Sequence, residues 1–320
     1  MSRTSSIIAA TFVGVLALAV GPAVAQDEEA APAFPIGFMP DAKAAAADIE
    51  EDTTRILNGD IAVEGAWPWQ VGLISRGAPS IFDGQFCGGT LISRTWVLTA
   101  AHCVYDEAPD LSLTRVPPDE IEILAGTNYL EDGDGELIAV EAIYAHPDYD
   151  PAAIDNDIAL IRLAEAPSDP DIAAIKLPSL AAEEQLAAPG TPAIVVGWGR
   201  LQDGRFPIDL RQVQISLFDR SECNSLISGP PKPGVVIQGD ITENMICSGV
   251  SEGGRGSCNG DSGGPLMVAM PDGTYLQVGI VSWGYTADNA AGCSLEAEFS
   301  AFTRVAIYQQ WIMDTIAAAN

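Results

Sequence analysis

Short apolar runs separated by turn-forming residues recur along most of the chain, and this pattern is the strongest constraint on the fold. The runs have the length of β-strands, and Gly, Pro, Asn and Asp stand between them. They are Trp69–Ile74, Thr90–Leu98, Ile121–Leu124, Ile158–Leu163, Ala193–Val196, Val213–Leu217, Leu266–Val268 and Gln277–Ser282. Many short strands with such turn signals are typical of barrels and sandwiches, so we predict an all-β fold.

The last segment follows a different period. Val305, Tyr308, Trp311, Ile312 and Ile316 recur at the spacing of one helix face. We therefore predict a C-terminal α-helix over about 305–318 that packs one face against the body of the protein.

The first 25 residues have the features of a secretory signal peptide. Arg3 supplies positive charge, Ile7–Val20 is almost entirely apolar, and Ala23–Ala25 is a small-x-small cleavage site. The alternative is a membrane anchor, but the apolar run is shorter than the roughly 20 residues that a helical span needs. Six cysteines suit an oxidising compartment. The sequence therefore predicts a secreted or periplasmic protein.

The formal net charge of the chain is −29. A body this acidic repels nucleic acid and anionic membrane surfaces, so we expect neither as a partner. Solubility is the simpler explanation of the charge, and a specific cationic partner is the alternative.

A glycine-rich hexapeptide, residues 260–265 (GDSGGP), carries a candidate nucleophile, Ser262. Glycines allow sharp turns and a close approach of the backbone to a ligand. A serine hydroxyl is a weak nucleophile by itself, and it needs a base and a group that orients that base. The base has to be His102 or His146, since the chain has no other histidine.

His102 lies in residues 99–103 (TAAHC), and a candidate orienting carboxylate, Asp157, lies in residues 155–160 (DNDIAL). The chain order is therefore His, Asp, Ser, as in the chymotrypsin template. His146 lies in a sequence typical of a surface turn, AHPDY, and we expect it to be structural or solvent-facing and not catalytic.

These three motifs resemble those of the trypsin/chymotrypsin family of serine proteases, and the resemblance extends from about Ile56 to the C-terminus. It implies two antiparallel six-stranded β-barrels followed by the C-terminal α-helix, with the active site in the cleft between the barrels. The first barrel would span about 56–170 and the second about 171–304.

The resemblance also implies a role for each residue. Ser262 would be the nucleophile, His102 the general base and Asp157 the orienting carboxylate. The N–H groups of Gly260 and Ser262 would form the oxyanion hole. The family start pattern places an activation cut between Arg55 and Ile56, which makes 26–55 a propeptide and 56–320 the peptidase domain. The new ammonium group of Ile56 would pair with Asp261.

The substrate pocket is where the sequence departs from trypsin-type enzymes. The floor position that holds an acid in those enzymes is Gly256 here, and a second position that sometimes carries charge is Ser300. We therefore predict cleavage after apolar or small residues, since an Arg or Lys side chain would be desolvated without a carboxylate. The alternative is cleavage after Arg or Lys, with charge supplied by Asp288, Glu296 or Glu298. The resemblance assigns Gly256, Ser257, Ser282, Trp283, Gly284 and Ser300 to the substrate groove, and Ser282 is expected to bond Asp157.

Six cysteines allow 15 pairings. The resemblance selects Cys87–Cys103, Cys223–Cys247 and Cys258–Cys293. Metal binding by cysteine is the alternative, but the chain has no Cys-x-x-Cys pair. We expect no cofactor. Some family members bind Ca²⁺ at the position of residues 130–136, and a solvated acidic hairpin tip is the alternative there.

The sequence thus predicts a serine endopeptidase that acts on proteins or peptides. Another protease would activate it. A catalytically dead, protease-like binding protein and an enzyme acting on esters are the competing hypotheses. The Ala-rich signal and the short propeptide point to a bacterial source.

Overall fold

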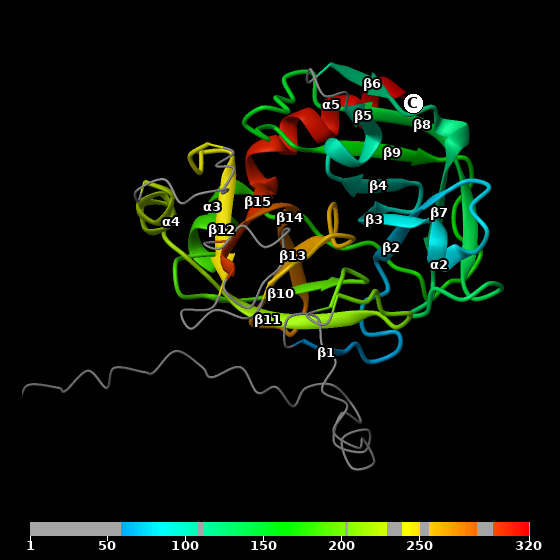
Figure 1. Ribbon diagram of the computed structural model, residues 1–320, viewed down its shortest axis with the longest axis horizontal. Coiled ribbons are helices and arrows are strands. Elements are labelled where there is room, and N and C mark those ends of the chain that lie inside the picture. The colour runs from blue at the N-terminus through cyan, green and yellow to red at the C-terminus, as the bar shows by residue number, and fades with distance from the viewer. Residues whose placement is uncertain are drawn as a thin grey trace, which may run out of the picture. The chain divides into compact units, whose positions relative to one another are not determined.

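The computed structural model describes residues 59–107, 112–201, 204–228, 239–249, 256–286 and 297–319. Two antiparallel β-barrels of six strands each form the core of the described structure (Figure 1). The predicted all-β fold is confirmed. The predicted signal peptide, the propeptide and the Arg55–Ile56 bond lie outside the described residues.

The first barrel closes in the strand order β2-β3-β4-β9-β8-β7. Its strands are β2 (Gln70–Ser75), β3 (Gln85–Ser93), β4 (Trp96–Thr99), β7 (Ile121–Ala125), β8 (Glu136–Ala145) and β9 (Ala159–Leu163). Branched and aliphatic side chains such as Val71, Leu73 and Ile161 fill its interior with no exposed surface. The predicted single run Thr90–Leu98 is in fact a hairpin, because Arg94 and Thr95 form the turn between β3 and β4.

The second barrel follows the order β11-β10-β13-β14-β15-β12, and pairing between β12 and β11 closes it. Its strands are β10 (Pro192–Gly197), β11 (Arg211–Leu217), β12 (Met245–Gly249), β13 (Pro265–Ala269), β14 (Tyr275–Thr286) and β15 (Ala297–Arg304). A short strand, β1 (Asp60–Ile61), pairs with β11. The described chain therefore begins on the sheet of the second barrel before it enters the first. The predicted boundaries instead assign residues from 56 onward to the first barrel.

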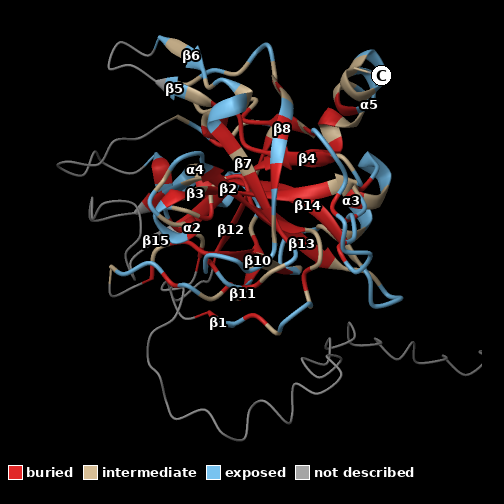
Figure 2. Cartoon of the chain, turned by 90° about the vertical axis from the view of Figure 1, so that its right-hand side faces the viewer, coloured by how far each residue is buried: buried red, intermediate tan, exposed pale blue. Residues whose placement is uncertain are grey.

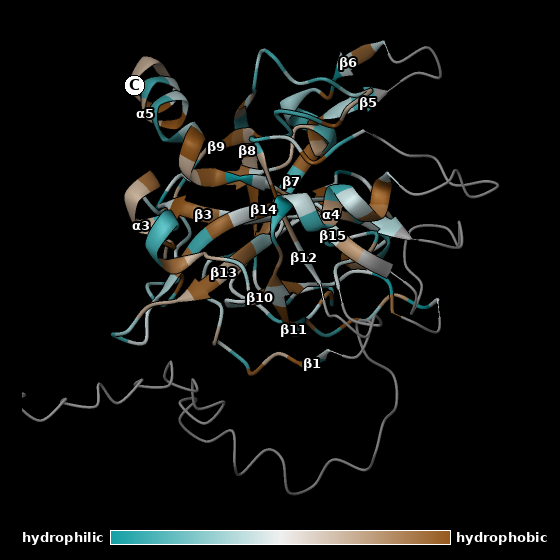
Figure 3. Ribbon diagram, turned by 90° about the vertical axis from the view of Figure 1, so that its left-hand side faces the viewer, coloured by the Kyte–Doolittle hydropathy of each residue, from teal (hydrophilic) through white to brown (hydrophobic). Residues whose placement is uncertain are grey.

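Short elements connect and cover the barrels. They are α2 (Ile81–Gly84), η2 (His102–Val104), β5 (Tyr105–Glu107), β6 (Leu113–Arg115), η3 (Pro118–Glu120), α3 (Leu180–Leu186) and α4 (Arg220–Ile227). The barrel strands are largely buried, whereas turns and outer helix faces are exposed (Figure 2). Strands such as β13 carry hydrophobic residues along their length (Figure 3).

The C-terminal segment forms η4 (Val305–Tyr308) and then α5 (Gln309–Ala319), which confirms the predicted helix. Its apolar face belongs to the core of the first barrel, where Ile312 is buried. Arg162 of β9 donates a hydrogen bond to the carbonyl oxygen of Ala319. The chain thus leaves the second barrel and returns to cover the first. No helix among the described residues is long and apolar enough to cross a membrane.

Candidate active site

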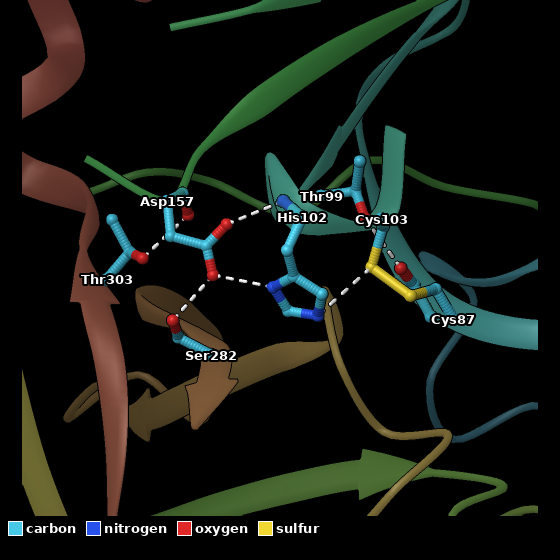
Figure 4. A network of polar contacts seen from close by, with 8 residues as sticks. Cys87, Thr99, His102, Cys103, Asp157, Ser282 and Thr303 are labelled. Atoms are coloured by element: carbon cyan, nitrogen blue, oxygen red, sulfur yellow. Dashed lines mark hydrogen bonds and ion pairs between the residues drawn. A yellow bond between two sulfur atoms is a disulfide. The ribbon is translucent and has the colours of Figure 1, made fainter. Parts of the chain in front are cut away.

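His102 and Asp157 lie side by side because their strands are neighbours. β4 pairs with β9 so that Thr99 faces Ala159, and the chain turns into η2 just beyond Thr99. The backbone N–H of His102 donates to Asp157 Oδ1 at 2.8 Å, and His102 Nδ1 lies 2.7 Å from Asp157 Oδ2 (Figure 4). Two contacts therefore fix the carboxylate relative to the imidazole ring.

Asp157 is completely buried, and further hydroxyl groups hold it in place. Ser282 Oγ donates to Asp157 Oδ2 at 2.5 Å, which confirms the predicted contact, and Thr303 Oγ1 donates to the Asp157 carbonyl oxygen at 2.7 Å. Burial alone would raise the pKa of Asp157, but the charge of His102 and the hydrogen bonds from His102 and Ser282 hold that pKa below its ordinary value. The charged carboxylate accepts from Nδ1–H, which leaves Nε2 as the proton acceptor of a neutral imidazole.

The backbone of Ser262 is held between the two barrels. Its carbonyl oxygen accepts from the N–H of Gly88 in β3 at 2.7 Å, and the next N–H, of Gly263, donates to the Val281 carbonyl oxygen in β14 at 2.8 Å. Cys87, next to Gly88, forms a disulfide with Cys103, which follows His102 (Figure 4). These links bring Ser262 to the same junction as His102 and Ser282.

The glycines around Ser262 are required by close packing. Gly263 has φ +81°, and a Cβ there would lie 2.2 Å from Thr99 Oγ1 and 2.4 Å from the Gly88 carbonyl oxygen. Gly260 has φ +98°, a conformation that L side chains rarely adopt. Packing excludes a side chain at Gly263, and the backbone conformation strongly favours glycine at Gly260, which accounts for these two glycines of the hexapeptide.

Asp261 is buried against backbone rather than against a cation. Its Oδ1 accepts from the Gly199 N–H at 2.7 Å, and its Oδ2 accepts from the Cys258 N–H at 2.8 Å. A Cβ on Gly197 or Gly199 would lie within about 2.2 Å of this carboxylate, so both glycines make room for it. Burial raises the pKa of Asp261 from 3.8 to about 6 despite the two hydrogen bonds. Among the described residues, no Lys or Arg forms an ion pair with Asp261.

Three of the predicted pocket residues, Gly256, Gly284 and Ser300, adjoin one another. A Cβ on Gly256 would be 3.1 Å from Ser300 Oγ, and both residues are buried. Gly284 pairs with Ser300 across β14 and β15, and the Trp283 ring packs edge-on against Phe299 at 5.9 Å. Ser257 is half-buried nearby in sequence. The three acids of the alternative hypothesis, Asp288, Glu296 and the side chain of Glu298, lie outside the described residues.

His146 has a packing role in this fold. Its ring contacts Tyr308 and Trp311 at centroid distances of 5.2 and 5.1 Å, so it helps to seat the C-terminal helix. Burial lowers the pKa of His146, although the charges of Asp148 and Asp155 oppose this. The imidazole that bonds the buried Asp157 is His102.

Two of the three predicted disulfides, Cys87–Cys103 and Cys223–Cys247, are present. The third includes Cys293, which lies outside the described residues. In the described part of the chain, the only cluster with metal-ligand spacing is Cys87, His102 and Cys103, and its two cysteines form a disulfide. In the acidic hairpin, Asp132 Oδ1 accepts from the Ile81 N–H, and both oxygens of Glu136 accept from the backbone N–H groups of residues 168 and 169.

Thr303 supports Asp157 although no sequence motif marks it. The two residues are 146 positions apart, and no local pattern links them.

Comparison with known proteins gives a family match over most of the chain. The profile of the trypsin family matches residues 56–312. Mannan-binding lectin serine protease 1 of Mus musculus is 33% identical over 277 residues, which are 83% of this chain and 36% of the relative. The protein of that name from Homo sapiens is 32% identical over 275 residues, with the same coverage. Ovochymase of Halocynthia roretzi is 34% identical over 270 residues, 81% of this chain and 15% of that protein. The chain therefore spans about a third or less of the length of these relatives.

Proposed function

The chain belongs to the trypsin family of serine endopeptidases, and from this premise we propose that it hydrolyses peptide bonds through Ser262, His102 and Asp157. The observation that carries the proposal is the buried Asp157, which bonds His102 Nδ1 and its backbone N–H at the junction that also holds Ser262. A serine nucleophile needs a base whose tautomer is fixed. The buried carboxylate fixes it here, because it holds the Nδ1–H of the imidazole and leaves Nε2 to accept a proton.

The reaction follows from these contacts. Ser262 Oγ attacks the scissile carbonyl carbon, and its proton passes to His102 Nε2. Asp157 stabilises the imidazolium that results, while the N–H groups of Gly260 and Ser262 donate to the oxyanion. His102 then gives the proton to the leaving amine. Water hydrolyses the acyl-enzyme by the same steps, which regenerates the Ser262 hydroxyl.

For the substrate pocket we propose a preference for apolar or small residues before the scissile bond. Gly256 and Ser300 adjoin one another and neither carries a charge. A guanidinium or ammonium group placed there would lose its water without gaining a carboxylate. Protein or peptide substrates with Leu, Phe, Val or Ala at that position fit such a pocket.

For activation we propose cleavage between Arg55 and Ile56 by another protease, because a neutral pocket disfavours cleavage after Arg. The ammonium group of Ile56 then pairs with Asp261, whose buried carboxylate has no cationic partner among the described residues. We also propose that residues 1–25 direct export, so that the enzyme works outside the cytosol.

A digest tests the proposed activity and specificity together. The precursor is cut at Arg55, incubated with a denatured protein mixture, and the new termini are identified by mass spectrometry, with Ser262→Ala as the matched control. Cleavage after Leu, Phe, Val or Ala that the control lacks supports the proposal. Cleavage after Arg or Lys contradicts the neutral pocket. If correctly cut protein hydrolyses esters but no peptides, the esterase hypothesis replaces the proposal. If it hydrolyses neither, the binding-protein hypothesis replaces it.

A further inference from the structure

Gln85 connects the first barrel to the loop that carries Gly260. It is the first residue of β3 and directly follows α2. Its side-chain Nε2 donates to the Gly260 carbonyl oxygen at 3.0 Å and to the Cys87 carbonyl oxygen at 3.1 Å. One amide group therefore ties the loop of the second barrel to the strand whose disulfide adjoins His102.

Gly260 depends on such a tie because its conformation is unusual. Its φ is +98°, and on its open side the nearest atoms to a Cβ would be Gly199 Cα at 3.2 Å, Phe206 Cε1 at 3.4 Å and Gln85 Oε1 at 3.6 Å. In the described part of the chain, no backbone carbonyl accepts from the Gly260 N–H. The direction of that N–H is set by the two peptide groups that flank the Gly260 Cα. The Gln85 side chain holds the second of them by donating to the Gly260 carbonyl oxygen.

We propose that Gln85 is a positioning residue of the oxyanion hole, which keeps the Gly260 N–H aimed at the reacting carbonyl oxygen. The proposal rests on the proposed function. A preorganised donor stabilises the transition state more than the bound substrate, so its misorientation lowers kcat and leaves KM nearly unchanged.

The placement of Gln85 is itself fixed by local contacts. Its backbone N–H bonds the Ile81 carbonyl oxygen at the end of α2, and Ser80 caps the start of that helix. Asp132 Oδ1 accepts the Ile81 N–H at 2.8 Å, so the acidic hairpin anchors the same turn. Gln85 is half-buried beside a surface pocket of about 220 Å³ that Phe82 and Phe206 also line, outside both barrel cores.

The expected size of the effect lies between two limits. Loss of one neutral hydrogen bond corresponds to about fivefold, and complete loss of one oxyanion donor to about 10²–10³-fold. The loop keeps the two hydrogen bonds that the Asp261 carboxylate accepts from the N–H groups of Gly199 and Cys258. We therefore expect kcat to fall about five- to fiftyfold.

The test compares three variants of the full chain, each cut at Arg55. Gln85→Met keeps the length of the side chain and removes the donor. Gln85→Glu sets a carboxylate against two carbonyl oxygens. Gln85→His restores an N–H donor. Gln214→Met, at an exposed position of β11, is the matched control. The readouts are kcat, KM, the melting temperature, and the affinity of a peptide boronic acid, which forms a tetrahedral adduct with the serine.

We expect kcat and boronic acid affinity to fall in parallel for Gln85→Met, further for Gln85→Glu, and to recover in part for Gln85→His. KM, the melting temperature and the Gln214→Met control should stay near wild type. Wild-type kcat in Gln85→Met and Gln85→Glu would overturn the inference, as would a kcat loss that only follows a lowered melting temperature. If the wild-type enzyme itself has no turnover, the proposed function and the inference both fail.

Discussion

Cleavage at Arg55 should stabilise the protein, and by an amount that depends on pH. In the described residues Asp261 is buried with two backbone N–H partners and no cation, and its pKa is raised from 3.8 to about 6. A carboxyl group with a raised folded-state pKa favours the folded state below its unfolded pKa, near 4, and this advantage is lost as the pH rises through about 6.

The rise in pKa from 3.8 to about 6 corresponds to about 3 kcal/mol of unfolding free energy lost by the uncut chain between pH 4 and pH 7. Pairing with the ammonium group of Ile56 would relieve that loss by favouring the charged carboxylate. The stability of the cut form relative to the uncut form should therefore grow by up to about 3 kcal/mol between pH 4 and pH 7. It should shrink again in alkali, where the amine loses its proton and can no longer pair with the carboxylate.

The assay is urea unfolding of the two forms from pH 4 to pH 9. Ser262→Ala is present in both to prevent self-digestion, and Arg55→Gln provides the uncut form. Parallel stability curves across the whole range would refute the reasoning, because they would mean that the freed ammonium does not reach Asp261.

Three further predictions concern the triad, the pocket and the acidic hairpin. Asp157→Asn should lower kcat near neutral pH by about 10⁴-fold, since an amide cannot hold the same tautomer or stabilise the imidazolium; steady-state kinetics measures this, and a loss below tenfold would contradict the assigned role. Gly256→Asp should move cleavage toward Arg and Lys by placing a carboxylate beside Ser300, and digestion of a peptide library measures the change. The melting temperature should be the same in Ca²⁺ and in a chelator, because the carboxylates of Asp132 and Glu136 already accept backbone N–H groups; a rise of several degrees with Ca²⁺ would show that the ion binds.

The elements with strong local signals were predictable from the sequence. The hexapeptide around Ser262 stands out because packing leaves no space for a side chain at Gly263, and TAAHC and DNDIAL mark the ends of paired strands. The helical period at the C-terminus predicts one α-helix over about 305–318 because one face packs on the first barrel, although its first turn is the 3-10 helix η4 and α5 begins at Gln309. In contrast, Thr90–Leu98 looked like one strand, since its turn at Arg94 and Thr95 has no Gly or Pro.

What the sequence could not supply were contacts between distant segments. One strand also lacks a clear local signal. β8 carries Ala at several positions, so its alternation of buried and exposed residues gives little hydrophobic contrast, and it is not among the predicted runs. Gln85 meets Gly260 across 175 residues, and Thr303 meets Asp157 across 146. Neither partner is marked by spacing or composition, because the barrels bring them together only after closing.

The most direct test of the central claim is covalent labelling by a fluorophosphonate probe, read by intact mass and peptide mapping. We expect one adduct per molecule, located on Ser262, in the form cut at Arg55, with much slower labelling of the uncut form and of His102→Ala. An unlabelled cut form, or an adduct on another residue that His102→Ala leaves unchanged, would contradict the assignment of Ser262 as a nucleophile activated by His102.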